Sequence, residues 1–356
     1  MELQGEWPEP VVSVQSLLAG GLTAIPERYV KPPSQRPAPR LVSPTDLPLV
    51  DLGGLTGSTP TEFQATVRKI SDACKEWGFF QVVNHGVSPD LMKRMMVVWR
   101  DFFLLPLEEK RAFANSPRTY EGYGSRIGVE KGTPLDWGDY FFLNFLPLSK
   151  RNYEKWPALF PPFRETVEEY GGEVVKLAER LMRALSISLG LEAGRLQEAF
   201  GGRDVDVGIR VNYYPKCPQP HLTLGLSSHS DPGGLTILLA DDHVKGLQVK
   251  KGGGWVTVQP VPGAFVVNLG DQIQVLSNTI YKSVEHQAVV NSDEERLSIA
   301  VFYNPKGEML IGPIPELVNK GCTSSYSPIT FNEYRLFIRT KGPRGKIQLE
   351  SCLKAI

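Results

Sequence analysis

Residues 205–305 contain a series of short apolar segments, and this series constrains the fold more than any other part of the chain. Turn signals separate the segments, among them Asp231-Pro-Gly-Gly, Lys251-Gly-Gly-Gly and Pro262-Gly. Short apolar runs between such turns predict strands, here at 208–214, 235–239, 246–250, 255–258, 264–269, 283–290 and 297–303. Many short antiparallel strands favour a double-stranded β-helix, the jelly-roll or cupin architecture.

Helical patterns surround this core. Residues 61–75, the stretch after Pro89 and residues 163–189 carry apolar positions at helical spacing. We therefore expect a mainly β fold with helical additions, in which residues 161–200 form backing helices and residues 306–356 a C-terminal extension with a helix. Residues 1–46 are rich in proline and predict an extended N-terminal arm that wraps the body.

Charge and composition point to a small ligand. The formal net charge is zero, which argues against a nucleic-acid footprint or a polybasic membrane patch. The four cysteines form no C-x-x-C pair, and no run of 18 apolar residues occurs. The N-terminus lacks the basic and apolar regions of a secretory signal. The expected location is the cytoplasm, with the nucleus as an additional compartment, and no obligate protein partner is inferred.

His229, Asp231 and His286 form a candidate metal site. If this pair sits on a strand or at its fraying end, residues i and i+2 point to the same side, so His229 and Asp231 can hold one ion together. His286 must then arrive from a strand distant in sequence, which a barrel or sandwich provides. Two imidazoles and one carboxylate form the facial triad that binds Fe(II) and leaves coordination positions open for substrates. The alternative is a chance pairing, because an H-x-D with a distant histidine is a weak motif by itself.

The other histidines are not expected to bind metal. His85 lies in an Asn-His-Gly turn, where a turn or cap role is expected. His221 and His243 follow Gln-Pro and Asp-Asp, which predicts surface or loop positions.

Two further segments show strand alternation with polar residues on one face. Arg296 and Ser298 share a face, and so do Arg210, Asn212 and Tyr214. A buried arginine without an anion is costly, and its planar fork suits a carboxylate. If these faces point inward, Tyr214 can donate to the carboxylate that Arg296 binds, and Asn212 can reach the metal-bound end. A diacid cosubstrate would satisfy such a site, with Arg210 as an additional cation beside it.

The combined set resembles the plant 2-oxoglutarate- and Fe(II)-dependent dioxygenases. The motifs that carry the resemblance are Asn212-x-Tyr214-Pro215, His229-x-Asp231, His286 and Arg296-x-Ser298, with Gly78-Phe-Phe-Gln-Val-Val-Asn-His-Gly upstream. The resemblance implies an N-terminal dioxygenase region at 47–160 and an Fe(II)/2-oxoglutarate core at 205–305. It also implies that 2-oxoglutarate chelates the iron, while Arg296, Ser298 and Tyr214 bind its 5-carboxylate. Ascorbate is the expected reductant.

Within this family the chain looks most like the jasmonate-induced oxygenases, with the anthocyanidin and flavonol synthases further away. Arginines at places that match Arg210, Arg335 and Arg339 bind the carboxylate of jasmonic acid in those enzymes. A helix over 330–339 would bring Arg335 and Arg339 onto one stripe with Phe331. The alternative is a solvated basic end of a helix that continues to Lys341.

Three phenylalanines are candidates for an apolar wall opposite these arginines. Strand parity places Phe302 on the inward face with Arg296, and Phe331 and Phe142 are the other candidates. Core packing explains any one of them equally well.

The sequence thus predicts 2-oxoglutarate-dependent hydroxylation of jasmonic acid by O2 to 12-hydroxyjasmonate, which would lower jasmonate signalling. One alternative is a flavonoid oxidase or hydroxylase of the same family. An alternative of another class is a non-catalytic hormone-binding protein that keeps the barrel without the chemistry.

Overall fold

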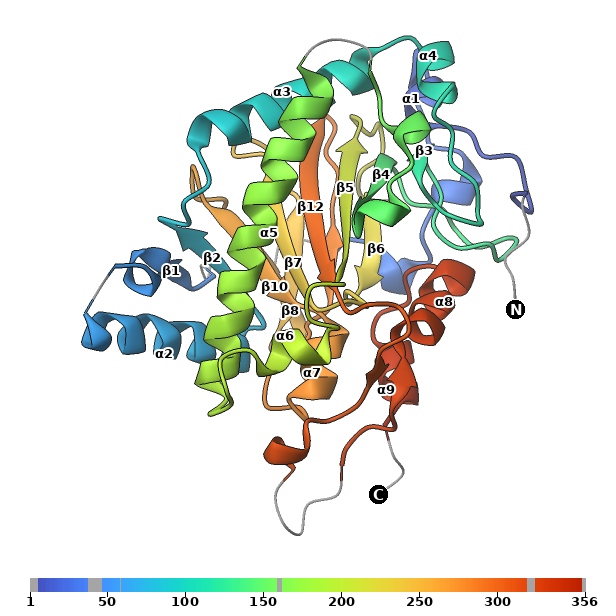
Figure 1. Ribbon diagram of the computed structural model, residues 1–356. Coiled ribbons are helices and arrows are strands. Elements are labelled where there is room, and N and C mark those ends of the chain that lie inside the picture. Colours follow the sequence, from blue (N-terminus) through green and yellow to red (C-terminus); the bar gives the residue numbers. More distant parts are fainter. Residues whose placement is uncertain (1–5, 38–46, 58, 159–161, 319–323, 354–356) are drawn as a thin grey trace.

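The computed structural model describes residues 6–37, 47–57, 59–158, 162–318 and 324–353, and two sheets form its centre (Figure 1). The larger sheet has the order β1-β2-β10-β7-β12-β5-β4-β3, and the smaller sheet has the order β6-β11-β8-β9. The strands of the larger sheet are β1 (Leu49–Asp51), β2 (Phe79–Val83), β3 (Gly122–Gly124), β4 (Asp139–Leu146), β5 (Asp206–Tyr214), β7 (Leu235–Ala240), β10 (Phe265–Leu269) and β12 (Arg296–Asn304). Those of the smaller sheet are β6 (Leu226–His229), β8 (Leu247–Lys251), β9 (Gly254–Thr257) and β11 (His286–Ala288).

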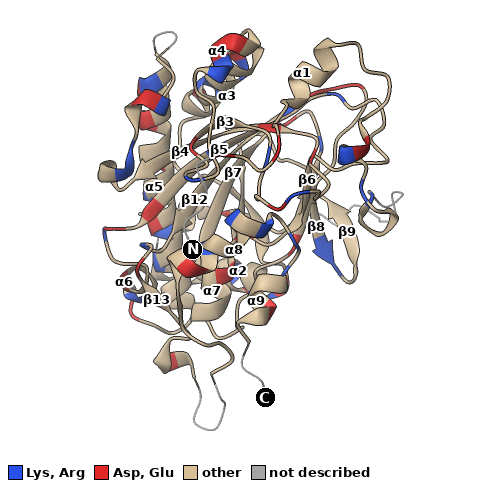
Figure 2. Ribbon diagram, turned by 90° about the vertical axis from the view of Figure 1, so that its right-hand side faces the viewer, with Lys and Arg blue, Asp and Glu red and all other residues tan. Residues whose placement is uncertain are grey.

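All pairings within these two sheets are antiparallel except that of β1 with β2. In Figure 2, β4, β5, β7 and β12 lie on one side and β6, β8 and β9 on the other, with α8 (Phe331–Lys341) in front of them. A short third sheet pairs β13 (Leu310–Ile311) with β14 (Ile329–Thr330), directly before α8. The jelly-roll core flanked by helices is therefore confirmed.

The outer face of the larger sheet is covered by helices (Figure 1). The long helix α5 (Phe163–Ser188) packs against β7 and β12, and α2 (Pro60–Glu76) and α3 (Pro89–Leu104) pack against α5. The buried side of α5 repeats every three to four residues, which is the pattern that predicted this helix; it includes Val167, Tyr170, Val174, Leu177, Leu181 and Leu185. The remaining α-helices are α1 (Val14–Ala19), α4 (Leu107–Arg111), α6 (Arg195–Ala199), α7 (Asp271–Leu276) and α9 (Ile347–Ser351), and the 3-10 helices are η1 (Glu27–Tyr29), η2 (Pro33–Gln35), η3 (Leu52–Leu55), η4 (Leu148–Lys150), η5 (Tyr153–Lys155) and η6 (Pro315–Leu317).

The helix predicted near the C-terminus is α8, and a capping box fixes where it begins. Thr330 accepts a hydrogen bond from the backbone N–H of Glu333, whose carboxylate accepts one from the Thr330 N–H in return. The helix ends at Lys341, and the residue that follows is Gly342, whose φ of 75° suits glycine. Phe331 and Tyr334 are buried on the inner side of α8.

The N-terminal arm differs from the prediction in one respect. Its described part contains α1, η1 and η2, so it is not extended throughout. Helix α1 forms because the Ser13 side chain accepts from the Ser16 N–H and because Asp139 accepts from the N–H groups of Val14 and Gln15. The proline count suggested extension and could not reveal this tertiary cap. Residues 1–5 and 38–46 of the predicted arm lie outside the described residues.

Other elements depart from the predicted pattern, among them β6, which carries His229 and lies outside the predicted strand ranges. Helix α7 follows β10 directly and was not predicted, and β11 covers three residues where a strand over 283–290 was expected. Of the helices in the described part of the chain, none has the length and apolar character that a membrane span requires.

Candidate active site

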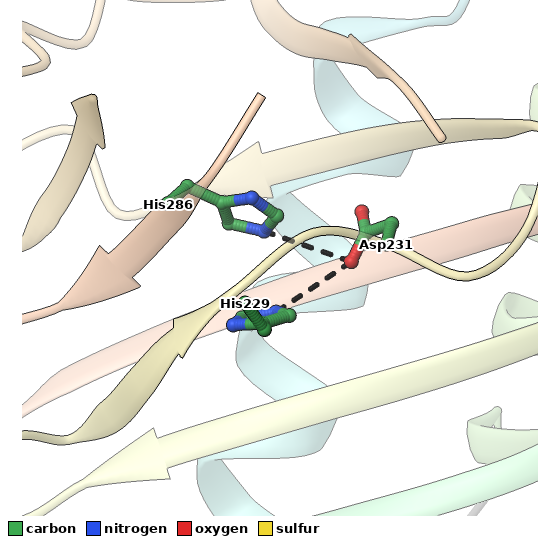
Figure 3. Close-up of side chains that lie close together, drawn as sticks. All are labelled: His229, Asp231 and His286. Carbon is green, nitrogen blue, oxygen red and sulfur yellow. Dashed lines mark ion pairs between the residues drawn. The ribbon is translucent and has the colours of Figure 1, made fainter. Parts of the chain in front are cut away.

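His229, Asp231 and His286 lie together where β6 and β11 pair (Figure 3). His229 and His286 are direct partners in the antiparallel register, and their ring centres are 4.2 Å apart. Nε2 of His229 lies 3.5 Å from Asp231 Oδ1, and Nε2 of His286 lies 3.6 Å from the same oxygen. One ligand atom from each residue lies within 4.8 Å of the others. The donor set and its convergence on one side fit an Fe(II) ion.

The backbone sets which imidazole nitrogen faces the site. Nδ1 of His229 lies 2.8 Å from the Ser227 carbonyl oxygen, and Nδ1 of His286 lies 3.2 Å from that of Val284. A carbonyl oxygen can only accept, so both Nδ1 atoms carry the proton and donate. Nε2 of each ring is therefore left with a free lone pair for a metal.

Asp231 offers one oxygen to the site and keeps the other one occupied. Its Oδ2 accepts hydrogen bonds from Thr236 Oγ1 at 2.5 Å and from Asn268 Nδ2 at 2.8 Å. Oδ1 is the oxygen that faces both imidazoles. This arrangement favours a carboxylate that binds a metal through one oxygen, which leaves more of the coordination sphere to ligands from solution.

The charges of the triad support the same interpretation. Burial acts to raise the pKa of Asp231, but the two histidines and the hydrogen bond from Asn268 hold that pKa well below its ordinary value. Burial, with the nearby His229, lowers the pKa of His286 to about 4. Asp231 is therefore ionised and His286 neutral near pH 7, which are the forms that bind a metal.

Arg296 and Tyr214 lie side by side at one end of the cavity. Strand β12 pairs with β5 so that Arg296 is opposite Tyr214 and Ser298 opposite Asn212. The Arg296 guanidinium lies 5.4 Å from the centre of the Tyr214 ring, and its Nε donates to the Val244 carbonyl. Burial lowers the pKa of Arg296.

Among the described residues, no carboxylate forms an ion pair with Arg296. A buried cation without a partner is destabilising, so Arg296 is expected to bind an anion that is not part of the protein. Gly246 makes room for the Arg296 side chain, because a Cβ there would lie 2.9 Å from Arg296 Cδ.

The three further arginines lie at another part of the same cavity. Arg210 comes from β5, and Arg335 and Arg339 come from α8. Burial lowers the pKa of all three, and burial together with the charge of Arg335 lowers that of Arg339 to about 10. Asp206 lies 4.0 Å from Arg335, but Lys150 already binds this carboxylate at 2.7 and 2.9 Å. The group therefore keeps a surplus of positive charge.

The cavity joins all of these residues. Its volume is about 220 Å³, and its apolar lining includes the predicted phenylalanines Phe142, Phe302 and Phe331. Gly208 leaves space for Phe142, whose ring would lie 2.7 Å from a Cβ at that position. A larger cavity of about 750 Å³ adjoins it and shares residues such as Tyr140, Arg210 and Tyr214 with it. The predicted candidates for iron, cosubstrate and substrate thus surround one space.

The other histidines occupy the positions that the sequence predicted. His85 Nε2 contacts the Gly263 carbonyl at 2.9 Å, and its Nδ1 accepts from the Val87 N–H, as a turn residue does. His221 and His243 are exposed, and His243 pairs with Asp242.

Thr236, Asn268 and Tyr120 line the cavity and were not singled out from the sequence. Thr236 and Asn268 hold Asp231, whereas Tyr120 and Tyr140 lie against the arginines. Tyr140 belongs to the aromatic-rich stretch 120–148, whose composition favours a loop and strand that line an apolar site, and it lies two residues before Phe142 on β4. Tyr120 lies outside a strand, so no periodic signal marks it.

Comparison with known proteins decides the family. The model of the 2OG-Fe(II) oxygenase superfamily matches residues 205–305, and that of the non-haem dioxygenase N-terminal region in morphine synthesis matches residues 47–162. Jasmonate-induced oxygenases 1 and 4 of Arabidopsis thaliana are 56% and 57% identical over 97% and 98% of this chain, and the matches cover 87% and 98% of those proteins. The chain belongs to the 2OG-Fe(II) oxygenase superfamily. It is a 2-oxoglutarate- and Fe(II)-dependent dioxygenase, and the predicted cofactors Fe(II) and 2-oxoglutarate are confirmed.

A solved structure supports the same assignment. The crystal structure of JOX2 in complex with 2OG, Fe, and JA is 55% identical, with a TM-score of 0.92, and covers 98% of this chain and all of that one. The predicted resemblance to jasmonate-induced oxygenases is confirmed. A flavonoid relative is more distant, since the oxoglutarate-dependent flavonoid 7-O-demethylase 1 of Ocimum basilicum is 41% identical over 96% of this chain and 90% of its own length.

Proposed function

We propose that this dioxygenase hydroxylates jasmonic acid to 12-hydroxyjasmonate and thereby lowers jasmonate signalling in plant defence. The observation that carries the proposal is the group of Arg210, Arg335 and Arg339 at one part of a largely apolar cavity that also holds the triad. A small acid with a hydrocarbon body matches this combination of surplus charge and apolar wall. The likeness to jasmonate-induced oxygenases and to JOX2 with JA adds to it.

Each group of side chains has a defined task in the proposed reaction. Iron, held by His229, Asp231 and His286, supplies the activation of O2 when it is bound. The reaction converts jasmonic acid, 2-oxoglutarate and O2 into hydroxyjasmonate, succinate and carbon dioxide, so one oxygen atom goes to each organic product.

The cosubstrate is held at the β5–β12 end of the cavity. Arg296 binds the 5-carboxylate of 2-oxoglutarate with help from the hydroxyls of Ser298 and Tyr214, which adjoin it in the strand register. Asn212 lies opposite Ser298 and is assigned to the metal-bound end of the cosubstrate, while its Oδ1 accepts a hydrogen bond from Arg210 Nε at 2.6 Å. These contacts orient 2-oxoglutarate before the organic substrate enters.

The organic substrate is oriented by its two ends. The arginines bind its carboxylate, while Phe142, Phe302 and the buried Phe331 contact its hydrocarbon part. The distance between the carboxylate and the reacting carbon then decides which C–H bond faces the iron. This selection is the reason to expect hydroxylation at the far, pentenyl end.

The product is the direct test of this proposal. The purified protein would be incubated with jasmonic acid, 2-oxoglutarate, Fe(II), ascorbate as the proposed reductant and ¹⁸O-labelled O2. We expect one labelled oxygen atom at C12, found by tandem mass spectrometry and by comparison with authentic 12-hydroxyjasmonate. A hydroxyl at another carbon would contradict the regiochemistry, and turnover of a dihydroflavonol but not of jasmonic acid would favour the flavonoid oxidase alternative. Absence of succinate release with iron, ascorbate and jasmonic acid present would favour a hormone-binding protein without catalysis.

The cellular location is part of the same proposal. We place the enzyme in the cytoplasm and also in the nucleus. A fluorescent fusion expressed in plant cells tests this, and accumulation in a secretory or plastid compartment would contradict it.

A further inference from the structure

Aromatic rings lie beside the guanidinium groups of the arginines that are proposed to bind the acid. The Arg210 guanidinium lies 3.9 Å from the centre of the Tyr140 ring, and that of Arg339 lies 5.9 Å from the centre of the Tyr120 ring. A ring face attracts a cation without neutralising it, so the arginine keeps its charge for a ligand. The orientation of the Arg210 and Arg339 side chains therefore depends on the positions of these two tyrosine rings.

Both tyrosines are fixed through their hydroxyl groups. Tyr120 Oη donates to the Arg339 carbonyl at 2.6 Å and accepts from the Gly128 N–H at 3.1 Å. Tyr140 Oη donates to the Arg126 carbonyl at 2.9 Å and accepts from Asn115. The loop 126–132 thus supports both rings. It also contacts α8 directly, because the Val129 N–H donates to the Thr340 carbonyl at 2.9 Å.

The N-terminal arm in turn holds this loop. Glu9 Oε2 pairs with Arg126 Nη1 at 2.8 Å, and Glu9 Oε1 accepts from the Gly132 N–H at 3.1 Å. The Arg126 side chain is only 1% exposed, and within the described part of the chain Glu9 is the carboxylate that pairs with it. Trp7 packs edge-on against the Tyr120 ring, with centroids 5.4 Å apart and an interplanar angle of 86°.

We propose that Glu9 and Trp7 are positioning residues through which the N-terminal arm aligns Arg210 and Arg339 for the substrate carboxylate. The inference rests on the proposed acid-binding role of these arginines and extends it to the arm. The contacts of Glu9 and Trp7 lead to the loop 126–132 and to Tyr120 rather than to Arg296 or Ser298, so their loss should weaken binding of the acid and leave binding of 2-oxoglutarate unchanged.

The test separates the two ligands. Glu9→Gln removes the charge that pairs with Arg126, and Glu6→Gln, at an exposed position three residues earlier, is the matched control with the same change in charge. For Glu9→Gln we expect KM for jasmonic acid to rise about three- to thirty-fold, the range for residues that act on a ligand through others, with KM for 2-oxoglutarate unchanged. Glu6→Gln should match the wild type in both constants.

A second pair of variants distinguishes a loss of positioning from a general loss of folding. Trp7→Leu should raise KM for the acid, and Trp7→Phe, which keeps an aromatic edge against Tyr120, should restore most of it. Thermal unfolding of each variant is measured alongside.

The outcomes distinguish this inference from the proposed function. If the wild type converts jasmonic acid but KM for the acid in Glu9→Gln equals that in Glu6→Gln, the arm has no positioning role. Equal increases in KM for the acid and for 2-oxoglutarate would also overturn the inference, because they indicate a general loss of structure. A wild type that neither binds nor converts jasmonic acid would overturn the proposed function and the inference together.

Discussion

Substitution of Arg210 by glutamine tests the proposed carboxylate site at its most informative position. Arg210 lies on β5 within the cavity, its Nε donates to Asn212 Oδ1 at 2.6 Å, and no described carboxylate pairs with it. Its guanidinium is therefore available to the substrate. A hydrogen bond to a charged group contributes about 1.5–3 kcal/mol, so Arg210→Gln should lower kcat/KM for jasmonic acid by about 10- to 150-fold. The KM for 2-oxoglutarate should change less than the KM for the acid, because Arg210 acts on the cosubstrate only through Asn212.

The methyl ester of jasmonic acid completes the experiment. The ester has no negative charge, so it should react poorly with the wild type and lose little more in Arg210→Gln. Initial rates of succinate formation are measured with the acid and with the ester, in the wild type and in the variant. They give kcat/KM for each of these four combinations. Arg203→Gln removes a charge at an exposed position and serves as the control. Equal losses for acid and ester would refute the reasoning, because Arg210 would then act on something other than the carboxylate.

Three further substitutions test the other parts of the site. Thr236→Val removes the hydroxyl that donates to Asp231 Oδ2 and should weaken Co(II) binding by about 10- to 100-fold in calorimetry; unchanged affinity would show that the hydroxyl does not orient the ligand. Arg296→Gln should raise KM for 2-oxoglutarate by about 10- to 150-fold, and KM for jasmonic acid is measured separately. A rise in KM for jasmonic acid alone would reverse the assignment of the two parts of the cavity to cosubstrate and acid. Gly208→Ala places a methyl group 2.7 Å from the Phe142 ring and should push the ring into the cavity, which raises KM for the acid but not for 2-oxoglutarate. A wild-type KM for the acid in that variant would argue that Phe142 does not line the bound substrate.

The sequence predicted the residues that strand parity places. Arg296, Ser298 and Phe302 alternate on β12, and the structure puts all three on the cavity, as it does Arg210 and Asn212 of β5. A period of two is a property of the strand itself, so it can be counted along the chain. Strand parity alone could not predict that His229 and His286 lie opposite each other, because the register of β6 with β11 depends on the folded barrel.

The residues that support the site could not be predicted from strand periodicity. Tyr120 and the loop 126–132 lie in irregular structure, and Glu9 reaches Arg126 across 117 positions of the chain. Their partners are set by tertiary contacts that have no local period. Helix α1 shows the same limit, because its N–H groups are capped by Asp139 from a distant strand.

The most direct test of the account is a competition between substrates. Wild-type protein with iron, 2-oxoglutarate and ascorbate would receive equal concentrations of jasmonic acid, methyl jasmonate and a dihydroflavonol in one vessel, and the loss of each would be followed with succinate by mass spectrometry. The account predicts that jasmonic acid disappears first, that its hydroxylated product equals the succinate formed, and that the ester and the flavonoid remain until the acid is spent. Preferential loss of the dihydroflavonol, or equal loss of acid and ester, would contradict the claim that the arginines select a carboxylate.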